Sequence, residues 1–210
     1  MPTKLTMILA ALSITTLTAL GQHSESAVRA YNQGTTFYTR SEYTKAIPYL
    51  EQAIALDTNY TDAYDNLGTT FYAMGSYDSA AHYLEISLRK SPTGLAAIQN
   101  LAMVEEKRGN LPKAVEYFQR VTVIQPKNAE AYYEMARLLG TMGKTKESLS
   151  PALTAEKLFT AAKSPLLPQC HFLLFMIYYN LPDKPMVKKY RALCKKENVE
   201  IPALLALDPD

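Results

Sequence analysis

Apolar and small residues recur along the middle of the chain with a period of about 34 residues. Within each period they fall twice at the spacing of a helix face, and a turn separates the two runs. Glycine marks this turn in three of the four periods, at Gly75, Gly109 and Gly143. The pattern therefore predicts four helical hairpins, at residues 27–60, 61–94, 95–128 and 129–162.

Small residues fill three columns of the repeat, where the two helices of a hairpin would meet. They are Gly34, Gly68, Ala102 and Ala136; Ala46, Ala80, Ala114 and Ser148; and Ala53, Ser87, Val121 and Ala155. Larger side chains there would hold the two backbones apart. Because one hairpin cannot bury its own apolar face, neighbouring hairpins are expected to stack and share a core. The predicted fold class is all-α, an array of antiparallel helix hairpins.

The unit 61–94 carries the clearest set of pattern residues, namely Tyr64, Leu67, Gly68, Phe71, Tyr77, Ala80, Leu84 and Pro92. With them the chain resembles the tetratricopeptide repeat (TPR) family, which has this period. The unit 129–162 is weaker, since Ser148 and Ala152 replace better packing residues and Pro151 is expected to interrupt its second helix. The resemblance implies a right-handed superhelical solenoid.

The remainder of the chain breaks the repeat register after residue 162. Two further helical segments predict a degenerate hairpin over residues 163–198. This hairpin would cap the array, because the last apolar face of a repeat array needs a cover. In the tail, residues 199–210, the apolar run 203–207 either packs back onto the cap or binds a partner.

The N-terminal segment has the pattern of an export signal. Lys4 precedes an uncharged, mostly apolar run at 5–20, and the small residue Gly21 follows. A retained transmembrane anchor would need roughly 20 predominantly apolar residues, and this run is shorter and diluted by serine and threonine. We therefore expect a cleaved signal peptide at 1–21 and a flexible mature N-terminus at 22–26. The protein would then be a periplasmic or secreted, bacterial-type TPR protein without an integral membrane span.

Charge and motifs argue against catalysis. The chain has 22 basic and 20 acidic residues and a net charge of +2, which is too even for a nucleic-acid-binding surface. The histidines, His23, His82 and His171, show no catalytic or metal-binding spacing, and no CxxC, HExxH or glycine-rich phosphate motif occurs. We expect no enzyme activity, no metal and no cofactor.

Two features of the predicted cap leave alternatives open. Cys170 and Cys194 are the only cysteines; export would permit a disulfide between them, and two buried thiols are the other interpretation. The basic residues of the segment 184–197 form either a solvated helix face or a contact with an anionic surface.

The TPR resemblance implies that the first helix of each hairpin lines a concave groove that binds a peptide. In the register of the repeat, the groove residues are Tyr31, Asn32, Thr35, Tyr38, Asp65, Asn66, Thr69, Tyr72, Gln99, Asn100, Met103, Tyr133, Glu134 and Arg137. Their charges, together with those of Asp62, Glu106 and Lys107, lean acidic, which favours a neutral or basic peptide.

One groove column contains Asn32, Asn66 and Asn100, with Glu134 at its end. Carboxamides both donate and accept hydrogen bonds, so such a column suits the backbone of an extended peptide. Alternatively, the asparagines persist from one ancestral unit or contact a neighbouring helix.

Three functions remain in competition. The leading hypothesis is an extracytoplasmic protein–protein interaction scaffold with a protein or peptide partner, part of a cell-envelope assembly. The alternatives are a structural module that associates with itself and an enzyme with an unrecognised site. The identity of the partner and the oligomeric state stay open.

Overall fold

The computed structural model describes residues 23–181 and 183–202. The predicted signal peptide and the apolar run 203–207 lie outside this part of the chain. The described residues form helices and no strand. The helices are α2 (Glu25–Thr39), α3 (Tyr43–Leu56), α4 (Thr61–Ala73), α5 (Tyr77–Lys90), α6 (Leu95–Lys107), α7 (Leu111–Ile124), α8 (Ala129–Thr141), α9 (Thr145–Ala162), α10 (Leu167–Asn180) and α11 (Lys184–Lys196).

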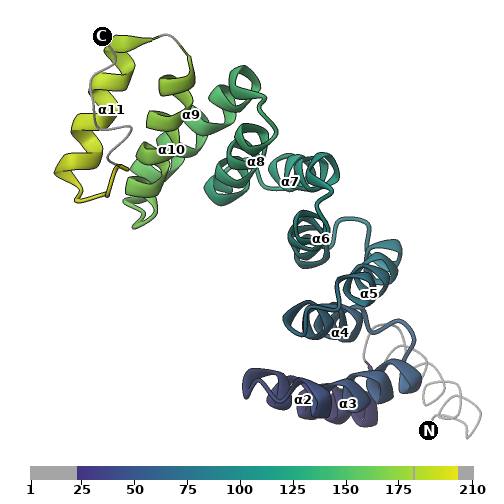
Figure 1. Cartoon of the computed structure of the whole chain (residues 1–210). Coiled ribbons are helices and arrows are strands. Elements are labelled where there is room, and N and C mark those ends of the chain that lie inside the picture. The colour runs from purple at the N-terminus through teal and green to yellow at the C-terminus, as the bar shows by residue number, and fades with distance from the viewer. Residues whose placement is uncertain (1–22, 182, 203–210) are drawn as a thin grey trace, which may run out of the picture.

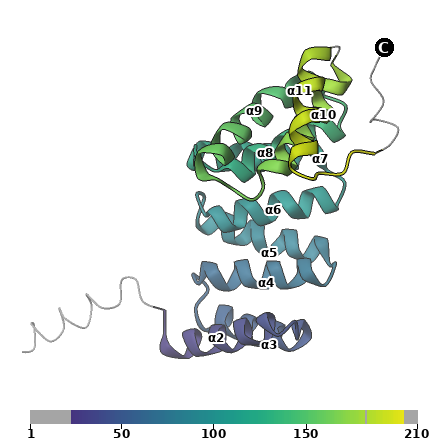
Figure 2. The ribbon, with the colours of Figure 1, turned by 90° about the vertical axis from the view of Figure 1, so that its left-hand side faces the viewer.

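Each helix packs against the next one along the chain, and the hairpins stack into a curved array (Figure 1). The view in Figure 2 shows these hairpins as successive layers, with α2 and α3 at one end and α10 and α11 at the other. This arrangement confirms the predicted all-α array of helix hairpins with an additional hairpin at its C-terminal end.

The close approach of the two helices within a hairpin depends on glycine at two positions. Gly34 on α2 faces Leu50, and Gly68 on α4 faces Leu84; both leucines are fully buried. A Cβ atom at Gly68 would lie 2.6 Å from Leu84 Cγ, and one at Gly34 would lie 2.7 Å from Leu50 Cγ. Non-bonded carbon atoms pack best at about 3.5–4.0 Å, so both positions require glycine at this helix spacing.

The expected interruption of the second helix of unit 129–162 is wrong. Helix α9 runs without a break through Pro151, which is buried. Proline removes one backbone hydrogen bond, but α9 is packed between α8 and α10. Its buried neighbours Ala152 and Ala155 hold it in the core, so tertiary packing outweighs the local loss.

Residues 23–26 belong to the predicted flexible N-terminus and contact the first hairpin in the structure. Helix α2 begins at Glu25, and the Ser24 side chain caps it by accepting a hydrogen bond from the Ala27 amide at 3.2 Å. His23 bonds to Asp57 and stacks on Tyr60 with 3.7 Å between ring centroids. Stacking and a carboxylate partner on the first hairpin therefore hold the start of the described chain in place.

The C-terminal hairpin is separated from the repeats by a left-handed residue. Lys163 ends α9 with φ at 49°, and the chain then turns into α10. The hairpin shares a buried core with α8 and α9, against which Val199 and Ile201 also pack. No helix in the described residues is long and apolar enough to cross a membrane.

Candidate functional site

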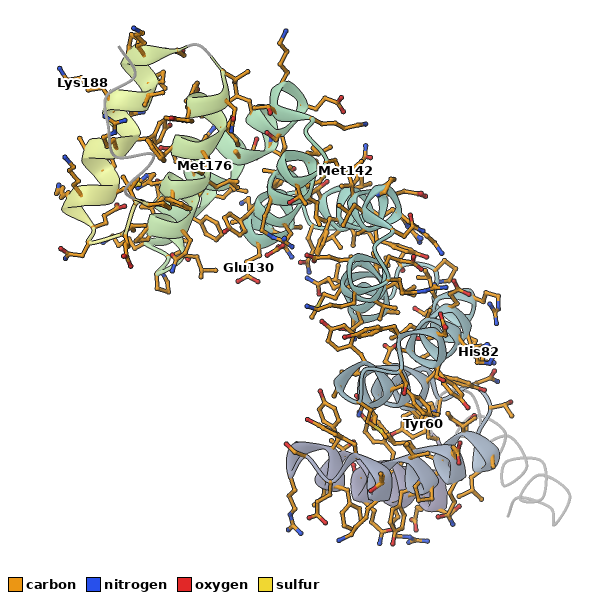
Figure 3. The ribbon with its side chains drawn as sticks, viewed as in Figure 1. Tyr60, His82, Glu130, Met142, Met176 and Lys188 are labelled. Atoms are coloured by element: carbon orange, nitrogen blue, oxygen red, sulfur yellow. The ribbon has the colours of Figure 1, made fainter. Side chains whose placement is uncertain are left out.

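A cleft of about 660 Å³ opens on the concave side of the array. Its walls come from α4, α6, α7 and α8 and from the start of α10. Glu130, labelled in Figure 3, lies on this side, whereas His82 lies on the convex side. Half of the predicted groove residues line this cleft, namely Tyr72, Gln99, Asn100, Met103, Tyr133, Glu134 and Arg137.

The cleft combines exposed apolar surface with charge. Met103 and Leu166 are 41% and 37% exposed, although both are large apolar side chains. Tyr72 and Tyr133 lie beside them in the lining, and both are half-buried. Tyrosine offers a large apolar area with a polar tip, so the cleft presents a surface suited to an apolar side chain.

One arginine ties two repeats together across the cleft. The Arg137 guanidinium donates to both carboxylate oxygens of Glu106 at 2.8 Å and to Glu134 at 2.7 Å. Burial lowers the pKa of Arg137, but the hydrogen bonds and charges of the two glutamates outweigh it and raise the pKa overall. Arg137 therefore stays charged and is held by the protein's own carboxylates.

The remaining charges make the cleft acidic. Its lining contains three carboxylates, Glu106, Glu130 and Glu134, against two cations, Lys107 and Arg137. Since Arg137 is already paired with two of the glutamates, the excess negative charge is available to a cationic group of a ligand.

The asparagine column joins consecutive repeats. Asn66 Nδ2 donates to Thr35 Oγ1, and Asn100 Nδ2 donates to Thr69 Oγ1, both at 3.0 Å. These bonds correspond to the alternative in which the asparagines contact a neighbouring helix. Asn32, the first of the column, is exposed.

The other half of the predicted groove residues lies outside the cleft. In the first hairpin Tyr31 packs against Tyr60 and Tyr38 against Tyr43, with ring centroids 4.8 and 5.7 Å apart. On α4, Asp65 is half-buried and its Oδ1 has no partner among the described residues. Burial raises the pKa of Asp65, and a hydrogen bond from Ser87 opposes this shift in part.

Sequence reasoning missed Leu166 and Gln169, which form the C-terminal wall of the cleft. Both belong to the segment that follows the break in repeat register. Pro165 indicates in the sequence that the repeat register breaks there. The direction in which the chain then continues depends on the left-handed conformation of Lys163 and on how α10 packs against α9. Glu130, in the first turn of α8, was also left out of the predicted groove.

The cysteines are buried and not bonded to each other. Burial raises the pKa of Cys170 to about 12 and that of Cys194 to about 11, which makes both poor nucleophiles, because the thiolate is the reactive form. Within the described ranges no group of histidine, cysteine and carboxylate side chains is arranged to hold a metal ion.

Sequence comparison identifies the repeat. The tetratricopeptide repeat family matches residues 66–129, and a TPR repeat pattern matches residues 34–75. These matches place tetratricopeptide repeats over residues 34–129 of the chain. No curated protein matches the sequence as a whole or in part.

Solved TPR structures share the fold of this chain. MamA from Desulfovibrio magneticus RS-1 has a TM-score of 0.73 at 18% identity and covers 85% of this chain and 99% of its own. YrrB, described as a TPR protein with an unusual peptide-binding site, has a TM-score of 0.70 at 19% identity, with 90% and 94% covered. The first TPR of Spaghetti (RPAP3), bound to an HSP90 peptide, has a TM-score of 0.55 at 17% identity, with 59% and 99% covered.

Proposed function

We propose that this TPR protein is a protein–protein interaction scaffold that binds a peptide or protein segment in the concave cleft. The observation that carries the proposal is the exposed apolar surface of Met103 and Leu166 in a cleft that two tyrosines also line. Large exposed apolar side chains in a concave site are typical of binding surfaces. The peptide bound by the Spaghetti TPR and the peptide-binding site of YrrB support a binding role for this fold.

The acidic balance of the cleft favours a neutral or basic segment. An apolar side chain of the ligand would contact Met103, and a lysine or arginine of the ligand would pair with Glu130, which is exposed. The role is one of binding and positioning, not of catalysis.

The test is a selection of random displayed peptides on the immobilised protein, followed by fluorescence anisotropy with the enriched peptides. Met103→Glu should weaken their binding at least tenfold, because it places a charge where an apolar contact is expected. The matched control is Val123→Glu on α7, since Val123 is 76% exposed and lies outside the cleft. Peptides that bind the Met103→Glu protein as well as the unchanged protein would refute the site.

We further propose that the scaffold acts outside the cytoplasm, in a cell-envelope assembly. The support is the signal-peptide pattern of residues 1–21. N-terminal sequencing of the protein from expressing cells should find Gln22 as the first residue. A chain that keeps Met1 at its N-terminus would contradict the proposal.

A further inference from the structure

A buried histidine lies between two carboxylates in the C-terminal hairpin. His171, in the second turn of α10, is 6% exposed. Its Nδ1 lies 2.9 Å from both carboxylate oxygens of Glu197, the C-cap residue that follows α11. Its Nε2 lies 3.4 Å from Glu156 Oε1 on α9. One imidazole thus connects three successive helices.

This geometry is complete only with the imidazolium ion. A neutral imidazole carries one N–H and one lone pair, so one of the two carboxylates would face a lone pair. In the protonated ring both nitrogens are donors, and each has an acidic partner. Hydrogen bonds between ionised groups are about twice as strong as neutral ones, so the loss of the proton weakens the connection on both sides.

The other titratable groups around His171 keep their state over the range in which histidine titrates. Tyr190 on α11 donates to Glu156 at 3.1 Å, and burial together with the charge of Glu156 raises the Tyr190 pKa far above its usual range. The pKa values of the Cys170 and Cys194 thiols are also raised by burial, to about 12 and about 11.

Two cations of α11 complete the surroundings. Lys189 reaches the Tyr190 hydroxyl at 3.4 Å, and Arg191 lies over the Phe175 ring. Lysine and arginine keep their charge throughout the histidine range. In this cluster, the His171 imidazole is the group whose two nitrogens both face a carboxylate.

The cluster lies next to the cleft. Leu166 and Gln169, which form the C-terminal wall of the cleft, lie five and two residues before His171 on the same segment. The His171 contacts therefore help to fix the segment that carries this wall.

We propose that His171 is a pH-sensitive latch that fixes the start of α10, and with it the C-terminal wall of the cleft, when its imidazole is protonated. The latch is closed while the imidazole carries both protons and loosens when one is lost. The consequence for ligand binding rests on the function proposed above, whereas the latch itself is a property of the folded chain.

The first test measures hydrogen–deuterium exchange of the protein without ligand at about pH 5.5 and about pH 8, corrected for the intrinsic pH dependence of exchange. We expect protection of α10 to fall about tenfold at the higher pH, the size of one charge-assisted hydrogen bond. His171→Gln should abolish this difference. His82→Gln removes an exposed histidine of α5 and should preserve it. Protection of α10 that is equal at both pH values in the unchanged protein would overturn the latch.

A second test covers the case in which His171→Gln fails to fold. Glu197 is partly exposed, at 22% of its side chain, and Glu197→Gln keeps an acceptor while removing the charge; the pH-dependent difference should shrink. In parallel, ¹H–¹⁵N correlation spectra should show both ring nitrogens of His171 protonated at about pH 5.5. A single protonated nitrogen at that pH refutes the latch. Failure of every peptide to bind at either pH would count against the proposed function alone, because neither readout uses a ligand.

Discussion

Gly68 shows how little room the two helices of one hairpin leave for a side chain. Gly68→Ala would place a Cβ 2.6 Å from Leu84 Cγ and 3.2 Å from the Ala80 carbonyl oxygen. We expect the substitution to lower the free energy of unfolding by about 1–3 kcal/mol, although alanine is the better helix former. Denaturant unfolding followed by circular dichroism measures the change.

Gly140 on α8 provides the matched control. It is also helical, but a Cβ added there meets no atom within 4 Å. Gly140→Ala should therefore raise the free energy of unfolding by up to about 1 kcal/mol through helix propensity alone. If both alanine variants gain stability, the close-approach explanation of Gly68 is wrong.

The asparagine column provides a second test with single residues. Asn66→Ala and Asn100→Ala each remove one hydrogen bond between consecutive repeats, and each should cost about 1 kcal/mol of unfolding free energy. Asn32→Ala is the control, because Asn32 is exposed and its side chain makes no hydrogen bond to another repeat within the described residues; its effect should stay within about 0.5 kcal/mol. Equal losses for all three variants would contradict a linking role for the two inner asparagines.

At the scale of the helix hairpin, the turn between the two helices has a fixed backbone requirement. Gly75, Gly109 and Gly143 adopt φ values of 77°, 79° and 74°, whereas the first hairpin places Ser41 in the same region with φ at 60°. The left-handed region costs a non-glycine residue roughly 1–2 kcal/mol. The first hairpin thus has the same turn geometry without the glycine that this geometry favours.

Exchanging the two residue types tests this requirement. Ser41→Gly should raise the free energy of unfolding by about 0.5–1 kcal/mol, and Gly109→Ser should lower it by a similar amount. Both positions are exposed, and an added Cβ at Gly109 meets no neighbour, so packing contributes little to either change. Thermal unfolding of the two variants gives the sign of each stability change. A loss of stability in both variants would show that the Ser41 side chain itself contributes to stability.

The hairpins were predictable from the sequence because their determinants are local. Spaced small residues and the turn glycines fix each helix pair, and the family pattern adds the direction of stacking. The cleft was predicted only in part. Its C-terminal wall depends on the αL residue Lys163 and on the packing of α10 against α9, which no short-range pattern encodes. Pro151 is a second example of a feature that short-range patterns do not encode. Helix α9 continues through this proline because it packs against α8 and α10.

At the scale of the whole molecule, the buried side chains form successive clusters along the array. Leu84 belongs to the cluster that extends from α5 to α8, and Leu174 belongs to the one that joins α8 and α9 to the C-terminal hairpin. Helix α8 contributes to both clusters. Since each hairpin of a repeat array contacts only its neighbours, damage in one cluster should stay largely within it.

Leu84→Ala and Leu174→Ala test this division with the same chemical change. Both leucines are fully buried, so each substitution should cost about 2–5 kcal/mol. Hydrogen–deuterium exchange should show lost protection in α4–α8 for the first variant and in α8–α11 for the second, because the cavity weakens only the helices that share that cluster. A uniform loss along the array in both variants would mean that the molecule unfolds as one unit. Loosening of the His171 contacts would then reduce hydrogen-exchange protection as far away as α2, and not only at the wall of the cleft.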